Sequence, residues 1–197
     1  MHNQFPQKSS SASFPAAQSS HLIFLLLAGL MLLTRFHHFG IDVHLPDASL
    51  AVFFLAGFYL KGWARFVILL LEAALIDYVA IKYFSVSDYC VSAAYGFLAP
   101  TYASVFLAGA WLQKNLQHSW QGAWQLVCAM AISVTIAFAI SNGSFYAFSG
   151  RFTDMVFAEY VVRTVQYYPP YVSAFVLYLL PVALLQAYLL SRKTSLA

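Results

Sequence analysis

Long apolar stretches follow one another along most of the chain, and they restrict its fold more than any other feature. A stretch of about 17 to 25 apolar residues can cross the hydrocarbon layer of a membrane as a helix. Six spans are predicted, the first two of them short: Leu22–Phe36, Ala48–Leu60, Phe66–Tyr83, Val91–Leu112, Ala123–Ile140 and Tyr171–Leu190. We therefore expect an all-α, polytopic membrane protein built as a six-transmembrane-helix bundle.

The composition supports this interpretation. Of the 197 residues, 61% are hydrophobic and 9% are charged, whereas globular proteins average roughly 45 to 50% and about 25%. The net charge of +3 comes from scattered basic residues, so the clustered basic surface that nucleic-acid binding requires is not expected. The lipid bilayer is the expected partner.

The first 20 residues differ from the rest of the chain. They contain one charged residue, Lys8, and a serine-rich run, and they lack a periodic apolar pattern. We predict a disordered tail over residues 1–20 and one membrane domain over residues 21–197. A cleaved signal peptide is the alternative, but no A-x-A-like site follows the stretch that ends at Leu33.

The distribution of basic residues predicts how the helices are oriented. With both termini in the cytoplasm, six basic residues lie inside and four lie outside; the outer four are Arg35, Lys82, Arg151 and Arg163. The positive-inside rule favours this orientation. The acids Asp42, Asp47, Asp88, Asp154 and Glu159 then also lie outside, which makes the outer face the chemically varied one.

The longest predicted connection runs from about Asn142 to Pro170. Connections of this length are uncommon unless they have a function. Within it Val156, Tyr160 and Thr164 recur at every fourth residue, which predicts an amphipathic helix at the outer end of the bundle. The helix is either a lid over an outward-facing pocket or an interfacial anchor.

Cys90 is a candidate nucleophile and metal ligand. It follows Ser87 and Asp88, either of which can cap a helix, so we expect its thiol in the first turn of the fourth span. Backbone N–H groups at a helix start favour the thiolate, which binds soft metals. The alternative is a cysteine that packs as a small hydrophobe, and Cys128 in the fifth span fits that alternative well.

Asp77 is a carboxylate inside the third predicted span. Such a group costs about 2.5 to 3.5 kcal/mol to insert and should face a partner inside the bundle. We expect Arg163 to be that partner and the hydroxyl of Tyr95 to join the pair. A structural Asp–Arg pair that fixes helix packing is the alternative to a binding role.

Several other functions have little support in the sequence. His37, His38 and His44 share one connection, but their spacing matches no known metal-site signature. The phosphate-binding motif G-x-x-x-x-G-K-[ST] does not occur, so no ATP site is expected in this chain. The motifs of hydrolases, zinc proteases and c-type cytochromes do not occur either.

Four features of the sequence point to a known family: the six short spans, the segment Ala74–Tyr78, the segment Asp88–Gly96, and Arg163 before the Tyr-Pro-Pro turn. Together they resemble the BtuM family of bacterial cobalamin (vitamin B12) transporters. That family is related to the S-components of energy-coupling-factor (ECF) transporters, which bind vitamins from the outer side within six helices. The resemblance implies cobalamin uptake across the bacterial inner membrane. Cobalamin is then the transported ligand.

The resemblance also implies roles for four residues. Cys90 matches the cysteine that is the axial ligand of the cobalamin cobalt and promotes decyanation of cyanocobalamin. Asp77, Tyr95 and Arg163 match residues near the bound corrinoid. These are the expected cofactor-binding and catalytic positions, and Cys90 is the expected metal ligand.

The partners and the function leave alternatives open. Many S-components carry an AxxxA pattern in the first helix for docking their coupling subunit, whereas here Ala28 and Gly29 are followed by Leu32 and Leu33. The surface of small residues that docks the ECF energising module is therefore missing, which argues against that module as a partner. One alternative function is a metal- or haem-handling membrane protein that uses the three histidines. Another is a structural subunit of a membrane complex.

Overall fold

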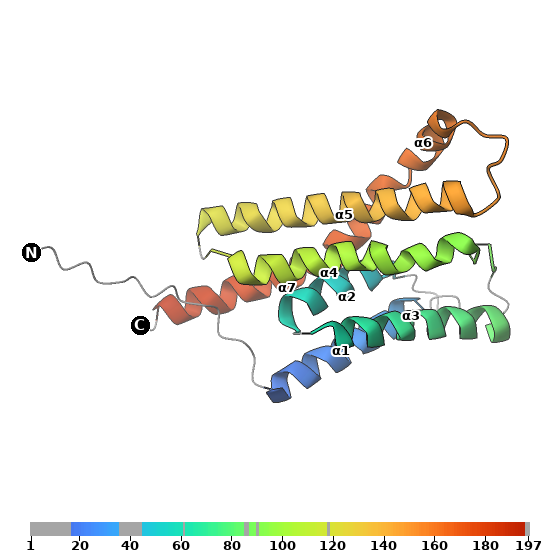
Figure 1. The fold of residues 1–197 in the computed structure, drawn as a ribbon. Helices are drawn as coiled ribbons and strands as arrows, with labels where there is room; N and C mark the ends of the chain where they lie inside the picture. Colours follow the sequence, from blue (N-terminus) through green and yellow to red (C-terminus); the bar gives the residue numbers. More distant parts are fainter. Residues whose placement is uncertain are drawn as a thin grey trace, which may run out of the picture.

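The computed structural model describes residues 17–35, 45–60, 62–84, 87–89, 91–117 and 119–195, and every regular element in these ranges is helical. The elements are α1 (Ala17–Arg35), α2 (Ser49–Tyr59), α3 (Trp63–Phe84), the 3-10 helix η1 (Ala93–Phe97), α4 (Leu98–Asn115), α5 (Trp120–Phe148), α6 (Phe157–Val165) and α7 (Tyr168–Ser195). The all-α prediction is confirmed. Figure 1 shows the long helices side by side, with α6 at one end of the molecule and the end of α7 at the other.

Among the described residues, three segments are long and apolar enough to cross a membrane: Ala93–Asn115, Trp120–Phe148 and Tyr168–Tyr188. α2 has 11 residues, a length of about 16 Å. α3 has 22 residues, but four of them are charged: Arg65, Glu72, Asp77 and Lys82. The three apolar helices are compatible with a membrane protein, whereas a bundle that crosses the membrane six times stays a prediction.

Large apolar side chains are exposed along the long helices. In α5, Val127 and Ile132 are 51% and 60% exposed, and in α7 Leu184 is 62% exposed. A water-soluble protein rarely leaves a continuous apolar surface of this kind uncovered. The exposed apolar surface is therefore what contact with lipid requires.

α2 is the buried centre of the bundle. Ser49 and the residues from Ala51 to Gly57 are all buried. A Cβ atom added at Gly57 would overlap the carbonyl oxygen of Phe106 in α4, and one added at Gly109 would overlap the carbonyl oxygen of Phe54 in α2. These two glycines allow the backbones of α2 and α4 to approach closely.

Some predicted boundaries are wrong. α1 begins at Ala17, so the last residues of the predicted tail are helical, while residues 1–16 lie outside the described ranges. α5 continues eight residues past the predicted end at Ile140, to Phe148. Its polar side chains bond within the helix there, since the Asn142 amide donates to the Phe138 carbonyl oxygen and the Ser144 hydroxyl donates to the Ser141 carbonyl oxygen. The predicted amphipathic helix is confirmed as α6.

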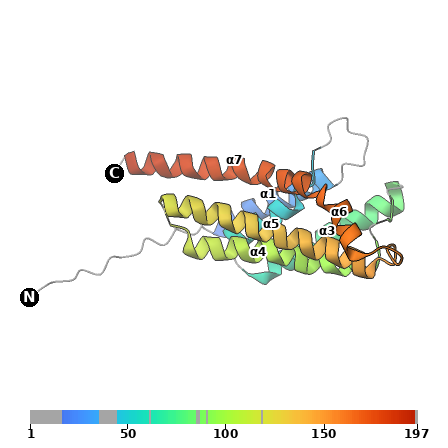
Figure 2. The same cartoon turned by 90° about the horizontal axis from the view of Figure 1, so that it is seen from above.

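The helix directions bring distant parts of the sequence to one end of the bundle. The C-terminal parts of α1, α3 and α5 meet the N-terminal parts of α2, α4 and α7 there. α6 lies at this same end, away from the C-terminal end of α7 (Figures 1 and 2). The candidate site is built at this end.

Candidate ligand-binding site

An ion pair between α1 and α3 lies at the centre of the site. Arg35, the last residue of α1, donates from Nε to Oδ1 of Asp77 at 2.7 Å and from Nη2 to Oδ2 at 2.6 Å. The two side chains are only 11% and 22% exposed. This two-point contact fixes the orientation of the Asp77 carboxylate and neutralises its charge.

The remaining nitrogen of Arg35 connects the pair to two further helices. Nη1 donates to Ser49 Oγ at the start of α2 at 2.9 Å and to the Tyr102 hydroxyl in α4 at 2.7 Å. The Tyr102 ring in turn stacks on Phe53, with 4.3 Å between the ring centroids. One guanidinium thus holds α1, α2, α3 and α4 together.

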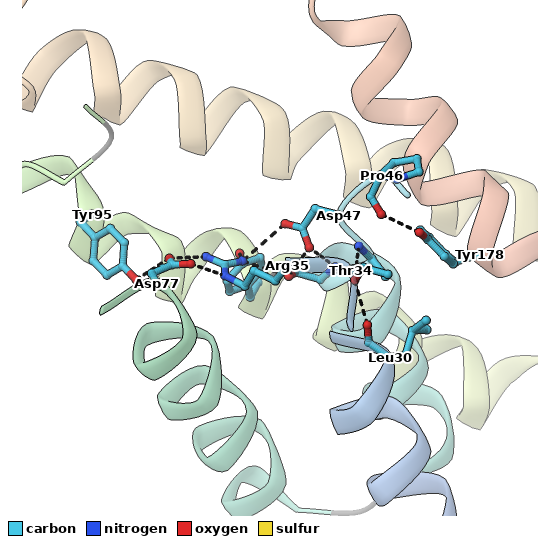
Figure 3. Close-up of polar contacts among 11 residues, drawn as sticks. Leu30, Thr34, Arg35, Pro46, Asp47, Asp77, Tyr95 and Tyr178 are labelled. Carbon is cyan, nitrogen blue, oxygen red and sulfur yellow. Dashed lines mark hydrogen bonds and ion pairs between the residues drawn. The ribbon is translucent and has the colours of Figure 1, made fainter. Parts of the chain in front are cut away.

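Tyr95 completes the hydrogen bonding of Asp77. It belongs to η1, whose start is capped by Ser92, because Ser92 Oγ accepts from the Ala94 N–H at 3.3 Å. The Tyr95 hydroxyl donates to Asp77 Oδ2 at 2.8 Å. The predicted contact between Tyr95 and Asp77 is confirmed, and Figure 3 shows the Asp77 carboxylate between Tyr95 and Arg35.

Asp47 lies on the other side of Arg35 (Figure 3). Its Oδ1 accepts from the backbone N–H and the hydroxyl of Ser49, at 2.9 and 2.6 Å, which forms a turn ahead of α2. Within the part of the chain that the structure describes, its Oδ2 contacts only Arg35 Nη1, at 3.4 Å, and the side chain is 42% exposed. The preceding Pro46 accepts a hydrogen bond from Tyr178 of α7.

These polar groups line a cavity of about 440 Å³. Arg35, Asp47, Asp77 and Tyr95 contribute to its wall, and so do the aromatic residues Phe97, Phe145 and Tyr171. Binding sites for small molecules are commonly about 300 to 1,000 Å³, mostly apolar, with a few polar groups that orient the ligand. The cavity has these properties.

The prediction that Asp77 forms an ion pair with Arg163 is wrong. Arg163 lies in α6 and bonds Glu159 one turn earlier at 2.7 Å, with both side chains more than half exposed. It does not line the cavity. Arg35 takes its place beside Asp77. The sequence analysis had placed Arg35 among the basic residues of the outer side. Its position at the end of the first apolar stretch was the feature that could have identified it as the partner of Asp77.

Cys90 lies outside the described residues, as do His37, His38 and His44. The expectation that Ser87 or Asp88 starts the fourth span is wrong. Residues 91 and 92 are not helical, and the helical segment begins at Ala93. The helix-start argument for a Cys90 thiolate therefore no longer applies, because position 90 comes three residues before the first helical residue.

α6 is held to the end of α5 by aromatic side chains. The Tyr160 ring packs on Tyr146 and Phe152, with ring centroids 4.9 and 4.8 Å apart. The buried Tyr160 hydroxyl donates to the carbonyl oxygen of Asn142 at 3.0 Å, and burial raises its pKa above the ordinary value. Because Asn142 also lines the cavity, these contacts place α6 beside it.

A contact between a cation and an aromatic ring connects the loop after α5 to the segment before η1. The Arg151 guanidinium lies over the ring of Tyr89, 4.0 Å from its centroid. The same ring packs on Phe145, with centroids 5.8 Å apart. A cation over an aromatic ring contributes about 0.5 to 1 kcal/mol at an exposed site, so this contact supports the wall of the cavity.

Cys128 lies far from these residues in the fold. It lines a separate, almost wholly apolar cavity of about 390 Å³ between α4 and α5, together with Trp111 and Trp124. This environment agrees with a cysteine that packs as a small hydrophobe.

Comparison of the sequence with protein-family models and with curated proteins gives no match.

Proposed function

We propose that the chain is a bacterial membrane transport protein that binds cobalamin in the cavity between α1, α3, η1 and α7. The observation that carries the proposal is the meeting of Asp77 and Tyr95, two positions that match the family resemblance, at one polar and aromatic cavity. Such a cavity at one end of a bundle with apolar outer surfaces suits a ligand that arrives from one side of a membrane.

The size of the cavity limits how the ligand sits. A whole cobalamin is larger than the cavity of 440 Å³, so the cavity receives only one edge of the corrin ring. That edge carries primary amides, which donate and accept hydrogen bonds. Carboxylate, amide and hydroxyl groups of the cavity wall are suitable partners for them.

Arg35, Asp77 and Tyr95 have a positioning role in this proposal. Arg35 and Tyr95 together donate three hydrogen bonds to the Asp77 carboxylate, so the carboxylate is presented to the ligand in one fixed orientation. A preorganised polar group loses little conformational freedom when the ligand binds.

Cys90 has the chemical role that the resemblance implies. The Cys90 thiol loses its proton as its sulfur donates an electron pair to the cobalt ion of cyanocobalamin. Cyanide leaves with the pair that bound it to the metal and takes up the proton as hydrogen cyanide. The step is a ligand exchange without a change in the oxidation state of cobalt. A soft sulfur donor suits this metal when its other ligands are nitrogen atoms.

The test is the absorption spectrum of cobalamin bound to the purified full-length protein. We expect the spectrum of the bound corrinoid to change in Cys90→Ala and to be retained in the matched control Cys128→Ala, because Cys128 lines the other cavity. If Cys90→Ala gives the wild-type spectrum and still removes cyanide, the sulfur ligand is refuted. If wild-type protein binds no corrinoid, the proposed function is refuted.

A further inference from the structure

The described part of the cavity wall carries more negative than positive charge. Among its described lining residues, one cation, Arg35, faces two carboxylates, Asp47 and Asp77. Arg35 makes its two shortest contacts with Asp77 and only a 3.4 Å contact with Asp47. The charge of Asp77 is therefore neutralised closely, while that of Asp47 is neutralised weakly.

The geometry of Asp47 leaves one of its oxygens available to a ligand. Oδ1 is occupied by two hydrogen bonds from Ser49, whereas the contact of Oδ2 with the described residues is the single long one to Arg35. The side chain is 42% exposed, about twice the exposure of Asp77. Oδ2 is thus a charged acceptor that can receive a hydrogen bond from a bound molecule.

A second acceptor lies in the same wall. The side-chain amide nitrogen of Asn142 donates to the Phe138 carbonyl oxygen at 3.0 Å. Its amide oxygen accepts no hydrogen bond from the described residues and is a second acceptor in a residue that lines the cavity. An N–H donor satisfies such acceptors, whereas an anion near Asp47 meets a like charge in a partly water-excluded space.

We propose that Asp47 makes the site selective for ligands that present neutral amide groups and excludes ligands that present a carboxylate at the same position. The inference rests on the proposed function, because it names the chemical class of ligand edge that the same cavity takes. For a corrinoid, the fully amidated ring is accepted, and a derivative in which one peripheral amide at this edge is hydrolysed to a carboxylate is rejected.

The experiment compares cyanocobalamin with its isomeric monocarboxylate derivatives, each titrated against the purified full-length protein at neutral pH. We expect at least one isomer to bind about tenfold or more weakly than cyanocobalamin to wild type, and we expect Asp47→Asn to reduce that difference to about threefold or less. Asparagine keeps an acceptor for the Ser49 N–H but removes the charge. Asp47→Ser, another residue that can form the turn, is the second variant should the first fail to fold.

Asp154→Asn is the matched control, since it removes an exposed carboxylate that does not line the cavity, and it should keep the wild-type discrimination. Equal binding of all isomers to wild type overturns the inference but not the proposed function. Discrimination that survives in the Asp47 variants also overturns it. Absence of binding of every corrinoid to wild type refutes the proposed function, and the selectivity with it.

Discussion

Arg35 is the residue whose removal should disturb the site most. In Arg35→Gln the Asp77 carboxylate keeps the Tyr95 hydrogen bond but loses its charge partner in a largely buried place. Breaking a buried pair in this way costs about 3 to 5 kcal/mol, and partial exposure reduces this to about 2 to 4 kcal/mol. We expect a matching loss in the free energy of unfolding, measured in detergent micelles.

Arg163→Gln is the matched control for that substitution. Its partner Glu159 is one turn away, and both side chains are more than half exposed, so the loss should stay below about 0.5 kcal/mol. Equal effects of the two substitutions would contradict the assignment of Arg35 as the central cation.

Tyr95→Phe tests the third residue of the hydrogen-bonded set Arg35, Asp77 and Tyr95. The substitution removes one hydrogen bond to Asp77 and keeps the ring in the cavity wall. A hydrogen bond to a charged group contributes about 1.5 to 3 kcal/mol, so cobalamin affinity should fall about tenfold if Asp77 orients the ligand. Unchanged affinity, by titration, would leave Tyr95 with a packing role only.

At the residue scale the sequence revealed Asp77 and Tyr95 but not their cation. Asp77 was identifiable because a carboxylate inside an apolar stretch needs a partner. Arg35 was not identified as that partner, because it is one of four basic residues predicted on the outer side and the sequence does not show which of them lies beside Asp77. Only the packing of α1 beside α3 brings Arg35 to Asp77.

At the scale of elements, the contact between α2 and α4 depends on two glycines. A methyl group at Gly109 would overlap the backbone of Phe54, so Gly109→Ala should force the helices apart. Overpacking costs typically 1 to 3 kcal/mol, and we expect about 2 kcal/mol or more here because the obstacle is backbone. Thermal unfolding in detergent measures the effect.

Gly143→Ala in α5 is the control, because nothing lies within 4 Å of a Cβ atom added there. Alanine favours a helix over glycine by about 1 kcal/mol, so this variant should be as stable as wild type or more stable. A stabilising effect at Gly109 would refute the close contact between α2 and α4.

The helices themselves were predictable from apolar stretches, and the amphipathic α6 from its repeat of four. Their ends were not. Ser141, Asn142 and Gly143 are residues typical of turns, yet α5 continues through them to Phe148. The Asn142 side chain bonds within the helix, to the Phe138 carbonyl oxygen. Ser92 caps the next helical segment in place of Ser87 or Asp88, which sequence preference alone does not distinguish.

At the scale of the whole molecule, the proposed orientation places the cavity outside the cell and the connection between α4 and α5 in the cytoplasm. In a Cys90→Ser, Cys128→Ser background, we expect Thr153→Cys to react with a membrane-impermeant maleimide in intact spheroplasts. Ser119→Cys should react only after permeabilisation. Both positions are exposed in the structure, and the reverse pattern would show that the orientation is inverted.

The central claim is that the cavity beside Arg35 and Asp77 is where cobalamin binds, and filling that cavity tests it most directly. Ala174 of α7 lines the cavity, whereas Ala187 is an exposed residue further along the same helix. In equilibrium titrations with cobalamin, Ala174→Trp should weaken binding more than about tenfold, and Ala187→Trp should bind as wild type does. Wild-type affinity in Ala174→Trp would show that the ligand binds elsewhere and would contradict the account.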